Sequence, residues 1–288
     1  MSALFDWLVL PMQYPFMQRA LIIALITGTC CAVLSCYLVL KGWSLMGDAV
    51  SHAVLPGMVI ATMVGLPVAL GAFVAGLFCA VATGWLQANS RVKSDTIMGI
   101  VFSGMFGLGL VLLTKADTDQ HLMHVLFGNL LGVSHDDILE TAVLGGACLG
   151  FVLLFRRDLL VMSFDPGHAR VIGLPTGFLH YGLLTALALT IVVSLKAVGV
   201  ILVVAMLIAP GAVAFLLTNQ FERMLLVATV VSVFSAVAGT LVSFHMDAAT
   251  SACIVLIQAS IFVAVLFLAP KRGLLAARRQ RGVRAAVA

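Results

Sequence analysis

Long apolar stretches, separated by short polar breaks, organise almost the whole chain. A membrane-spanning helix needs about 20 predominantly apolar residues, and the stretches have that length. They lie at 20–40, 43–66, 68–87, 96–114, 138–155, 177–195, 197–218, 224–244 and 252–269. The pattern therefore predicts nine transmembrane helices, or eight if two neighbouring stretches form one broken element.

Composition supports a membrane protein and excludes a soluble one. Of the 288 residues, 62% are hydrophobic and 10% are charged, whereas about a quarter of an average soluble domain is charged. No polar break is long enough for a soluble domain. We therefore expect an all-α, polytopic bundle in which 1–288 form a single transmembrane domain. Trp7, Tyr14 and Phe16 predict that segment 1–19 lies at the lipid–water interface.

Charge placement predicts how the helices are oriented. Basic residues cluster at Arg91, Arg156, Arg223 and in the tail 271–288, whereas the alternate breaks are acidic or neutral. The positive-inside rule assigns the basic breaks to the cytoplasm. With nine spans, the N-terminus is then outside and the C-terminus is cytoplasmic. Because most of the net charge of +4 comes from the tail beside a span, it is a topology signal and does not indicate nucleic acid.

One carboxylate and one imidazole lie well inside an apolar stretch. Asp48 and His52 are four residues apart, so a helix places them on the same face. An ionisable residue in mid-bilayer is costly, which makes it a functional candidate, and this pair suits Mn²⁺, Zn²⁺ or Fe²⁺. Pro56 and Gly57 should disrupt the helix one turn later. The alternative is a hydrogen bond that merely ties two helices together.

Two ligands are too few to hold a metal tightly. A twofold dimer would bring two carboxylates and two imidazoles together at its axis, so a second copy of the chain is part of this hypothesis.

A short helix is predicted outside the membrane at 165–173. Asp165 is a good N-cap with Pro166 after it, and Gly173 is a stop signal. Asp165, Ala169 and Gly173 repeat every four residues and give this helix one narrow face of small groups. Spacing alone leaves two interpretations open, a linker and a docking element.

Other polar residues carry weaker signals. The histidines and acids of the predicted outer breaks are interpreted as solvated loops, with metal capture or contact with a binding protein as the alternative. These residues are Asp117, Asp119, His121, His124, His135, Asp136, Asp137, His245 and Asp247. Gln258 is expected to hydrogen-bond a neighbouring helix. The six cysteines form no CxxC pair and read as small apolar residues.

Several of these segments resemble one protein family. The run GDAVSHAVLPG (47–57), the Asp165–Ala169–Gly173 loop, GVILVVAMLIAP (199–210) and LFGNLLGVS (126–134) are similar to segments of the membrane permeases of bacterial manganese/iron/zinc ABC importers. The resemblance covers about residues 20–270 in the same order. It implies a multi-pass protein of the bacterial cytoplasmic membrane.

The resemblance also implies a division of labour. An extracytoplasmic protein captures the metal, two permease subunits form the pathway, and two cytoplasmic ATP-binding subunits drive it. Asp48 and His52 would be transient ligands of the transported metal, which is cargo and not a resident cofactor. Asp165, Ala169 and Gly173 would contact the ATPase. The chain itself has no GxxxxGK[ST] phosphate loop, so we expect a transport subunit and not an enzyme.

The identity of the metal and the mode of energy coupling remain open at this stage. The run around Asp48 is closer to the manganese-type members, so manganese is favoured, with iron next and a zinc importer as the alternative. The rival class is a secondary carrier that uses Asp48 and His52 as a proton or cation relay. An importer needs the 165–173 helix, whereas a carrier would tolerate its loss.

Overall fold

The computed structural model describes residues 10–115 and 130–269. Within these ranges it contains helices and no strand, as the sequence predicts. In chain order the elements are α2 (Pro15–Lys41), α3 (Met46–Ala53), α4 (Leu55–Val64), α5 (Val68–Asn89), α6 (Ser94–Leu113), the short 3₁₀ turn η1 (Leu130–Gly132), α8 (His135–Leu154), α9 (Arg156–Phe164), α10 (Pro166–Val171), α11 (Thr176–Val198), α12 (Val200–Leu217), α13 (Phe221–Met246) and α14 (Thr250–Leu268).

The described part of the chain contains nine helical segments long and apolar enough to cross a membrane. The all-α transmembrane fold is thereby confirmed. No two neighbouring stretches merge. Instead, the stretch predicted as one span at 43–66 is divided into α3 and α4, which together cross as Met46–Val64.

The division between α3 and α4 has a local cause. Pro56 lies in the first turn of α4 and lacks an N–H, so it cannot donate to the carbonyl of His52 four residues earlier. The N–H of Val54 still forms the ordinary helical bond to the Val50 carbonyl, at 3.2 Å. The break falls at Val54, just before the proline and directly after the face that carries His52.

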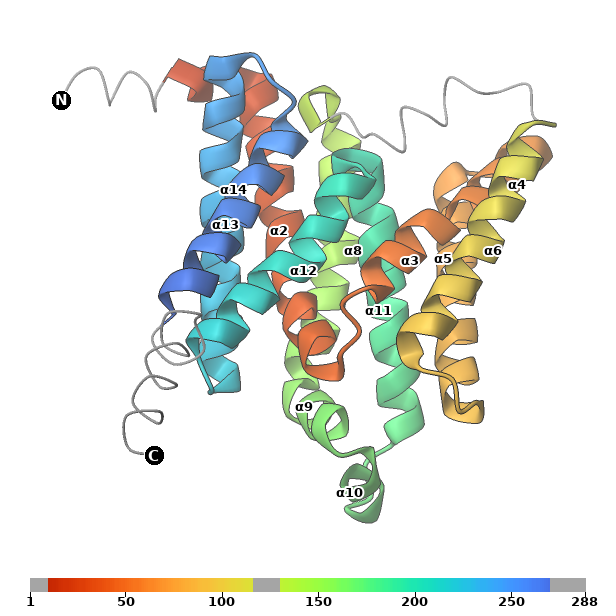
Figure 1. Ribbon diagram of the computed structural model, residues 1–288. Helices are drawn as coiled ribbons and strands as arrows, with labels where there is room; N and C mark the ends of the chain where they lie inside the picture. Colours follow the sequence, from red (N-terminus) through yellow and green to blue (C-terminus); the bar gives the residue numbers. More distant parts are fainter. Residues whose placement is uncertain (1–9, 116–129, 270–288) are drawn as a thin grey trace, which may run out of the picture.

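Helix α2 occupies the interior of the bundle (Figure 1). It packs against α8, α12 and α13, and its Cys31, Cys36 and Tyr37 side chains are fully buried. Helices α3 to α6 lie on one side of this centre, and α13 and α14 lie on the other (Figure 1). The α3–α4 pair joins the first of these groups to the rest of the bundle, because α3 packs on α5 and α6 and also on α11 and α12.

Polar side chains connect α2 to the last helices. The hydroxyl of Ser35 accepts from the Gly211 N–H at 3.0 Å and donates to the Ile208 carbonyl at 3.3 Å. These groups flank Pro210, which lies inside α12. On another face of α2, the Ser232 hydroxyl donates to the Gly28 carbonyl at 2.9 Å. Each bond satisfies backbone groups where lipid offers no partner.

The predicted short helix outside the membrane is present, and a second one precedes it. Helix α10 begins after Asp165, whose Oδ1 accepts from the His168 N–H at 2.9 Å, and the chain turns at Gly173 with φ +81°. The helix ends at Val171, two residues earlier than expected. Residues 156–164 were predicted only as a polar break. They form α9, because Leu159 and Met162 are buried against the bundle.

Both α9 and α10 lie at one end of the bundle, which we refer to as the α10 end; the C-terminal end of α14 lies there as well (Figure 1). Segments 1–9 and 271–288, which belong to the predicted interfacial segment and basic tail, lie outside the described residues.

Candidate metal site on the broken helix

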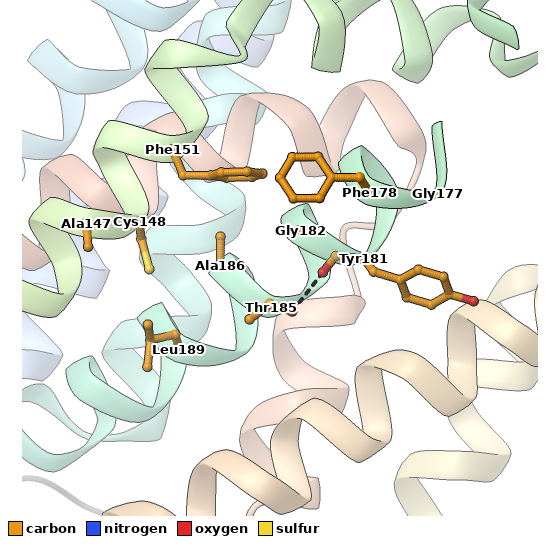
Figure 2. Close-up of a pocket in the computed structure, with 10 residues that line it drawn as sticks. All are labelled: Ala147, Cys148, Phe151, Gly177, Phe178, Tyr181, Gly182, Thr185, Ala186 and Leu189. Carbon is orange, nitrogen blue, oxygen red and sulfur yellow. Dashed lines mark hydrogen bonds between the residues drawn. The ribbon is translucent and has the colours of Figure 1, made fainter. Parts of the chain in front are cut away.

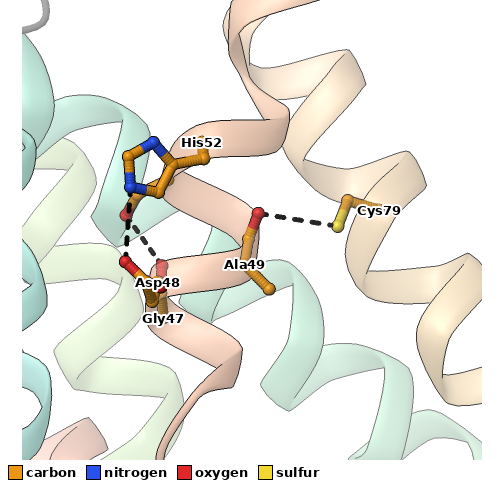
Figure 3. Close-up of polar contacts among 6 residues, drawn as sticks. Gly47, Asp48, Ala49, His52 and Cys79 are labelled. Atoms are coloured by element: carbon orange, nitrogen blue, oxygen red, sulfur yellow. Dashed lines mark hydrogen bonds and ion pairs between the residues drawn. The ribbon is translucent and has the colours of Figure 1, made fainter. Parts of the chain in front are cut away.

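Asp48 and His52 meet as the sequence predicts. Both lie on α3, and Asp48 Oδ1 is 3.4 Å from His52 Nε2. Figure 3 shows the two side chains on one side of the helix, while Cys79 of α5 lies on the other side, where its Sγ is 3.9 Å from the Ala49 carbonyl oxygen. The pair is half-buried: 41% of the Asp48 side chain and 33% of the His52 side chain are exposed.

Two aromatic rings of α6 contact the imidazole. The ring centroids of Phe102 and Phe106 lie 5.4 and 5.5 Å from that of His52. Phe102 and Phe106 are one helical turn apart, so they present one face to α3. Neither phenylalanine was predicted to belong to the site. Their i, i+4 spacing is visible in the sequence, but nothing there indicates which span they contact.

The opposite face of α3 is fixed by packing. Val50 and Ala53 are fully buried, and a methyl group built on Gly47 would come within 2.9 Å of the Leu207 side chain of α12. The hydroxyl of buried Ser51 donates to the Gly47 carbonyl at 2.7 Å. The helix therefore cannot rotate freely, and Asp48 and His52 are held on its remaining open face.

The donor set fits a divalent transition metal but is incomplete. A carboxylate oxygen and an imidazole nitrogen are ordinary ligands of Mn²⁺, Fe²⁺ and Zn²⁺. Across the residues that the structure describes, no group of three or more His, Cys, Asp or Glu side chains could hold a metal ion. This chain therefore offers two side-chain donors at α3, and a complete coordination sphere needs further ligands from elsewhere.

Among the described residues, the histidines and acids of the predicted outer breaks do not form a metal-binding group with Asp48 and His52. His135 and Asp136 are exposed at the start of α8, where Ser134 and Asp137 form a capping box. His245 lies in the last turn of α13, with Nδ1 2.9 Å from the Leu241 carbonyl oxygen. His121 and His124, with Asp117 and Asp119, lie outside the described residues.

The three predicted coupling residues lie at different depths. Asp165 and Gly173 are exposed, whereas Ala169 is fully buried against the rest of the chain. The outward surface at the end of α10 includes Val171 and Ile172, which are 86% and 52% exposed. The expected face of small groups is thus interrupted, because Ala169 packs α10 onto the bundle.

One minor prediction is wrong. Gln258 is buried, yet neither atom of its side-chain amide has a hydrogen-bond partner in the part of the chain that is described.

Comparisons with known proteins establish the family. The model of the ABC 3 transport family matches residues 13–269. The "Chelated iron transport system membrane protein YfeD" of Yersinia pestis is 63% identical over 92% of this chain and 90% of that protein. The "Manganese transport system membrane protein MntB" of Synechocystis is 50% identical over 94% of this chain and 88% of that protein.

A solved structure supports the same family. The structure described as "PsaBC from Streptococcus pneumoniae in complex with Fab" contains a chain that is 37% identical to this one, with a TM-score of 0.83, and the match covers 96% of this chain and all of that one. The resemblance to metal-ion ABC permeases is confirmed, as is the expectation of a transport subunit whose ATPase is separate. This chain belongs to the ABC 3 transport family.

Proposed function

We propose that this protein is the permease subunit of an ATP-driven importer of divalent transition metal ions, with manganese as the favoured cargo and iron next. The observation that carries the proposal is the Asp48–His52 pair on broken helix α3. It offers a carboxylate oxygen and an imidazole nitrogen in the membrane, where an ionisable residue otherwise carries a cost of about 2.5–3.5 kcal/mol.

The partial exposure of this pair supports a second permease subunit. A carboxylate with 41% of its side chain exposed is poorly placed against lipid. A second copy of this chain, or a related chain, would cover it and add a carboxylate and an imidazole across a twofold axis. Four side-chain donors then surround one ion, and an open, sparse ligand set lets the ion leave again.

The charges support an orientation. Basic residues lie at the end of α2 (Lys41), between α5 and α6 (Arg91), at the start of α9 (Arg156) and in the first turn of α13 (Arg223). These helix ends lie toward the α10 end (Figure 1). By the positive-inside rule this end faces the cytoplasm, in a bacterial cytoplasmic membrane. The C-terminus is then cytoplasmic, ATP-binding subunits engage α10, and an extracytoplasmic metal-binding protein delivers the ion at the opposite end.

The preference for manganese rests on sequence similarity. The names of close relatives mention both iron and manganese, and carboxylate and imidazole ligands do not separate these metals by affinity alone. Family membership weighs against the secondary carrier, because the relatives are membrane proteins of ABC transport systems.

Metal accumulation in cells that lack their own importers tests the proposal. Wild type, His52→Ala and Asp48→Asn are each expressed with the cognate ATPase and binding protein, and manganese, iron and zinc are measured together. His135→Ala is the matched control, because this histidine is exposed at the start of α8. We expect wild type and the control to raise manganese, and both site variants to abolish the rise at equal membrane abundance.

The other outcomes are equally informative. A rise in iron or zinc without manganese would contradict the choice of cargo and leave the permease assignment intact. Normal uptake by His52→Ala would mean that Asp48 and His52 are structural, and it would overturn the metal site.

A further inference from the structure

A cavity of about 380 Å³ lies between α10 and the transmembrane bundle. Its polar lining comes from four parts of the chain: Lys41 ends α2 and Trp43 follows two residues later, Gln87 is on α5, Arg170 is on α10, and His180 is on α11. Because α10 forms one wall, whatever occupies the cavity contacts both α10 and the spans.

The cavity favours an anion. Its lining contains Lys41, Arg170 and His180 but no carboxylate. Neither Lys41 nor Arg170 forms an ion pair with a described residue. Lys41 Nζ lies 4.4 Å from the Trp43 ring centroid. The Trp43 ring packs edge-on against the His180 ring, with 5.4 Å between the two centroids. Lys41 is therefore held at the cavity wall, and neither Lys41 nor Arg170 has a negative partner among the described residues.

Further hydrogen-bond donors point to the same chemistry. Gln87 Nε2 is buried and has no partner among the described residues. The 23-residue helix α11 begins at Thr176 beside the cavity. In its first turn the N–H groups of Gly177 and Phe178 have no backbone acceptor within the described chain, and such helix starts bind phosphate groups well.

An apolar groove adjoins this cavity along α11. It has a volume of about 570 Å³ and runs between α8 and α11. The rings of Phe151 and Phe178, which line it, pack edge to face with 5.9 Å between their centroids (Figure 2). Gly177 lines both the groove and the basic cavity. The Tyr181 ring of the groove also contacts the His180 ring of the cavity at 5.3 Å. The basic cavity and the apolar groove thus meet at Gly177.

We propose that the basic cavity and this groove together bind one anionic phospholipid, with its phosphate between Lys41, Arg170 and the start of α11 and one acyl chain between α8 and α11. A soluble phosphate compound would match the cavity but would leave the adjoining groove unused. The lipid bridges α10 to α2, α5 and α11. It therefore holds the short helix on the bundle, independently of which metal is carried.

Native mass spectrometry of the purified full chain tests the proposal. The protein is titrated with phosphatidylglycerol, with phosphatidylcholine of the same acyl chains, with glycerol 3-phosphate and with inorganic phosphate. We expect one phosphatidylglycerol to bind in preference to phosphatidylcholine. Lys41→Gln combined with Arg170→Gln should weaken that binding about tenfold or more, the effect of losing charge-assisted hydrogen bonds.

Two further variants separate the contributions. Thr185→Phe fills the groove without changing a charge and should also weaken phosphatidylglycerol binding. Arg157→Gln removes an exposed cation of α9 that does not line the cavity, and should bind like wild type. Circular dichroism checks that each variant keeps its helical content, so a loss of binding is not a loss of fold.

Two results would overturn the lipid assignment. If glycerol 3-phosphate or inorganic phosphate binds as tightly as phosphatidylglycerol and depends on Lys41, the cavity is a site for soluble anions. If both lipids bind equally and no variant changes their binding, the cavity has no headgroup site.

Discussion

Gly57 of α4 and Gly71 of α5 lie backbone against backbone, so that a methyl group built on either one would overlap the carbonyl group of the other. Small residues permit such close approach in lipid. On the next helix, Gly109 of α6 leaves room for the side chain of Leu55 in the same way. Helix α4, the second half of the broken span, is therefore packed tightly between α5 and α6, directly after the break that follows His52.

Gly71→Ala should destabilise the protein, because the added methyl group forces α4 and α5 apart. Overpacking of a well-packed interior costs about 1–3 kcal/mol, and thermal unfolding of the purified protein should show a lower midpoint. Gly99→Ala on α6 is the control, because nothing lies within 4 Å of a methyl group there. Equal midpoints for the two variants would contradict the close approach.

Ser35→Ala should also lower stability, through lost hydrogen bonds. The hydroxyl of Ser35 satisfies the Gly211 N–H and the Ile208 carbonyl beside Pro210. Leaving buried backbone groups without a partner costs about 1–3 kcal/mol, measurable by thermal unfolding. Ser260→Ala is matched to it, since the exposed Ser260 hydroxyl contacts only the Leu256 carbonyl of its own helix. A destabilisation no larger than that of Ser260→Ala would refute this role.

Phe102→Ala and Phe106→Ala should impair metal transport without removing a ligand. Their rings contact His52 and restrict the imidazole to a position near Asp48, and loosely held ligands bind and transfer less well. We expect metal accumulation to fall about tenfold in the double variant at unchanged membrane abundance.

A leucine pair at positions 102 and 106 should restore part of this transport, because a branched side chain still packs against the imidazole. Wild-type accumulation by the double alanine variant would show that the rings do not position His52.

Asp165→Ala should uncouple ATP hydrolysis from metal uptake. The carboxylate caps α10, a cap contributes about 1 kcal/mol, and a six-residue helix is not stable by itself. With the cognate ATPase present, uptake should fall more steeply than ATP hydrolysis does. Asp165→Asn keeps a capping oxygen and should behave like wild type. If Asp165→Asn loses metal uptake to the same extent as Asp165→Ala, the negative charge of Asp165 is required and not its capping oxygen.

The predictions from the sequence agree best with the structure where a single physical requirement decides the local conformation. In lipid, every backbone polar group must be satisfied within the chain, so apolar stretches of the right length become helices, and the described residues contain nine of them. The cap at Asp165 and the turn at Gly173 were also predictable, since both depend on residues within one helical turn.

The differences lie where packing decides. Helix α9 was not predicted, because its polar residues mark a break between spans. Contact of Leu159 and Met162 with the bundle, which buries both side chains, is not visible in that pattern. The same cause applies to Ala169: spacing placed it on a face with Asp165 and Gly173, but contact with the bundle buries it.

The sequence by itself determined the membrane-spanning character of the chain, the number of spans to within one and the pairing of Asp48 with His52, because apolar length and a four-residue spacing act locally. Only the tertiary structure decided what surrounds that pair. The phenylalanines of α6, the fixed rear face of α3 and the meeting of Lys41, Arg170 and His180 under α10 depend on which helices become neighbours. That choice is made by side-chain fit between segments far apart in the chain, and no local pattern encodes it.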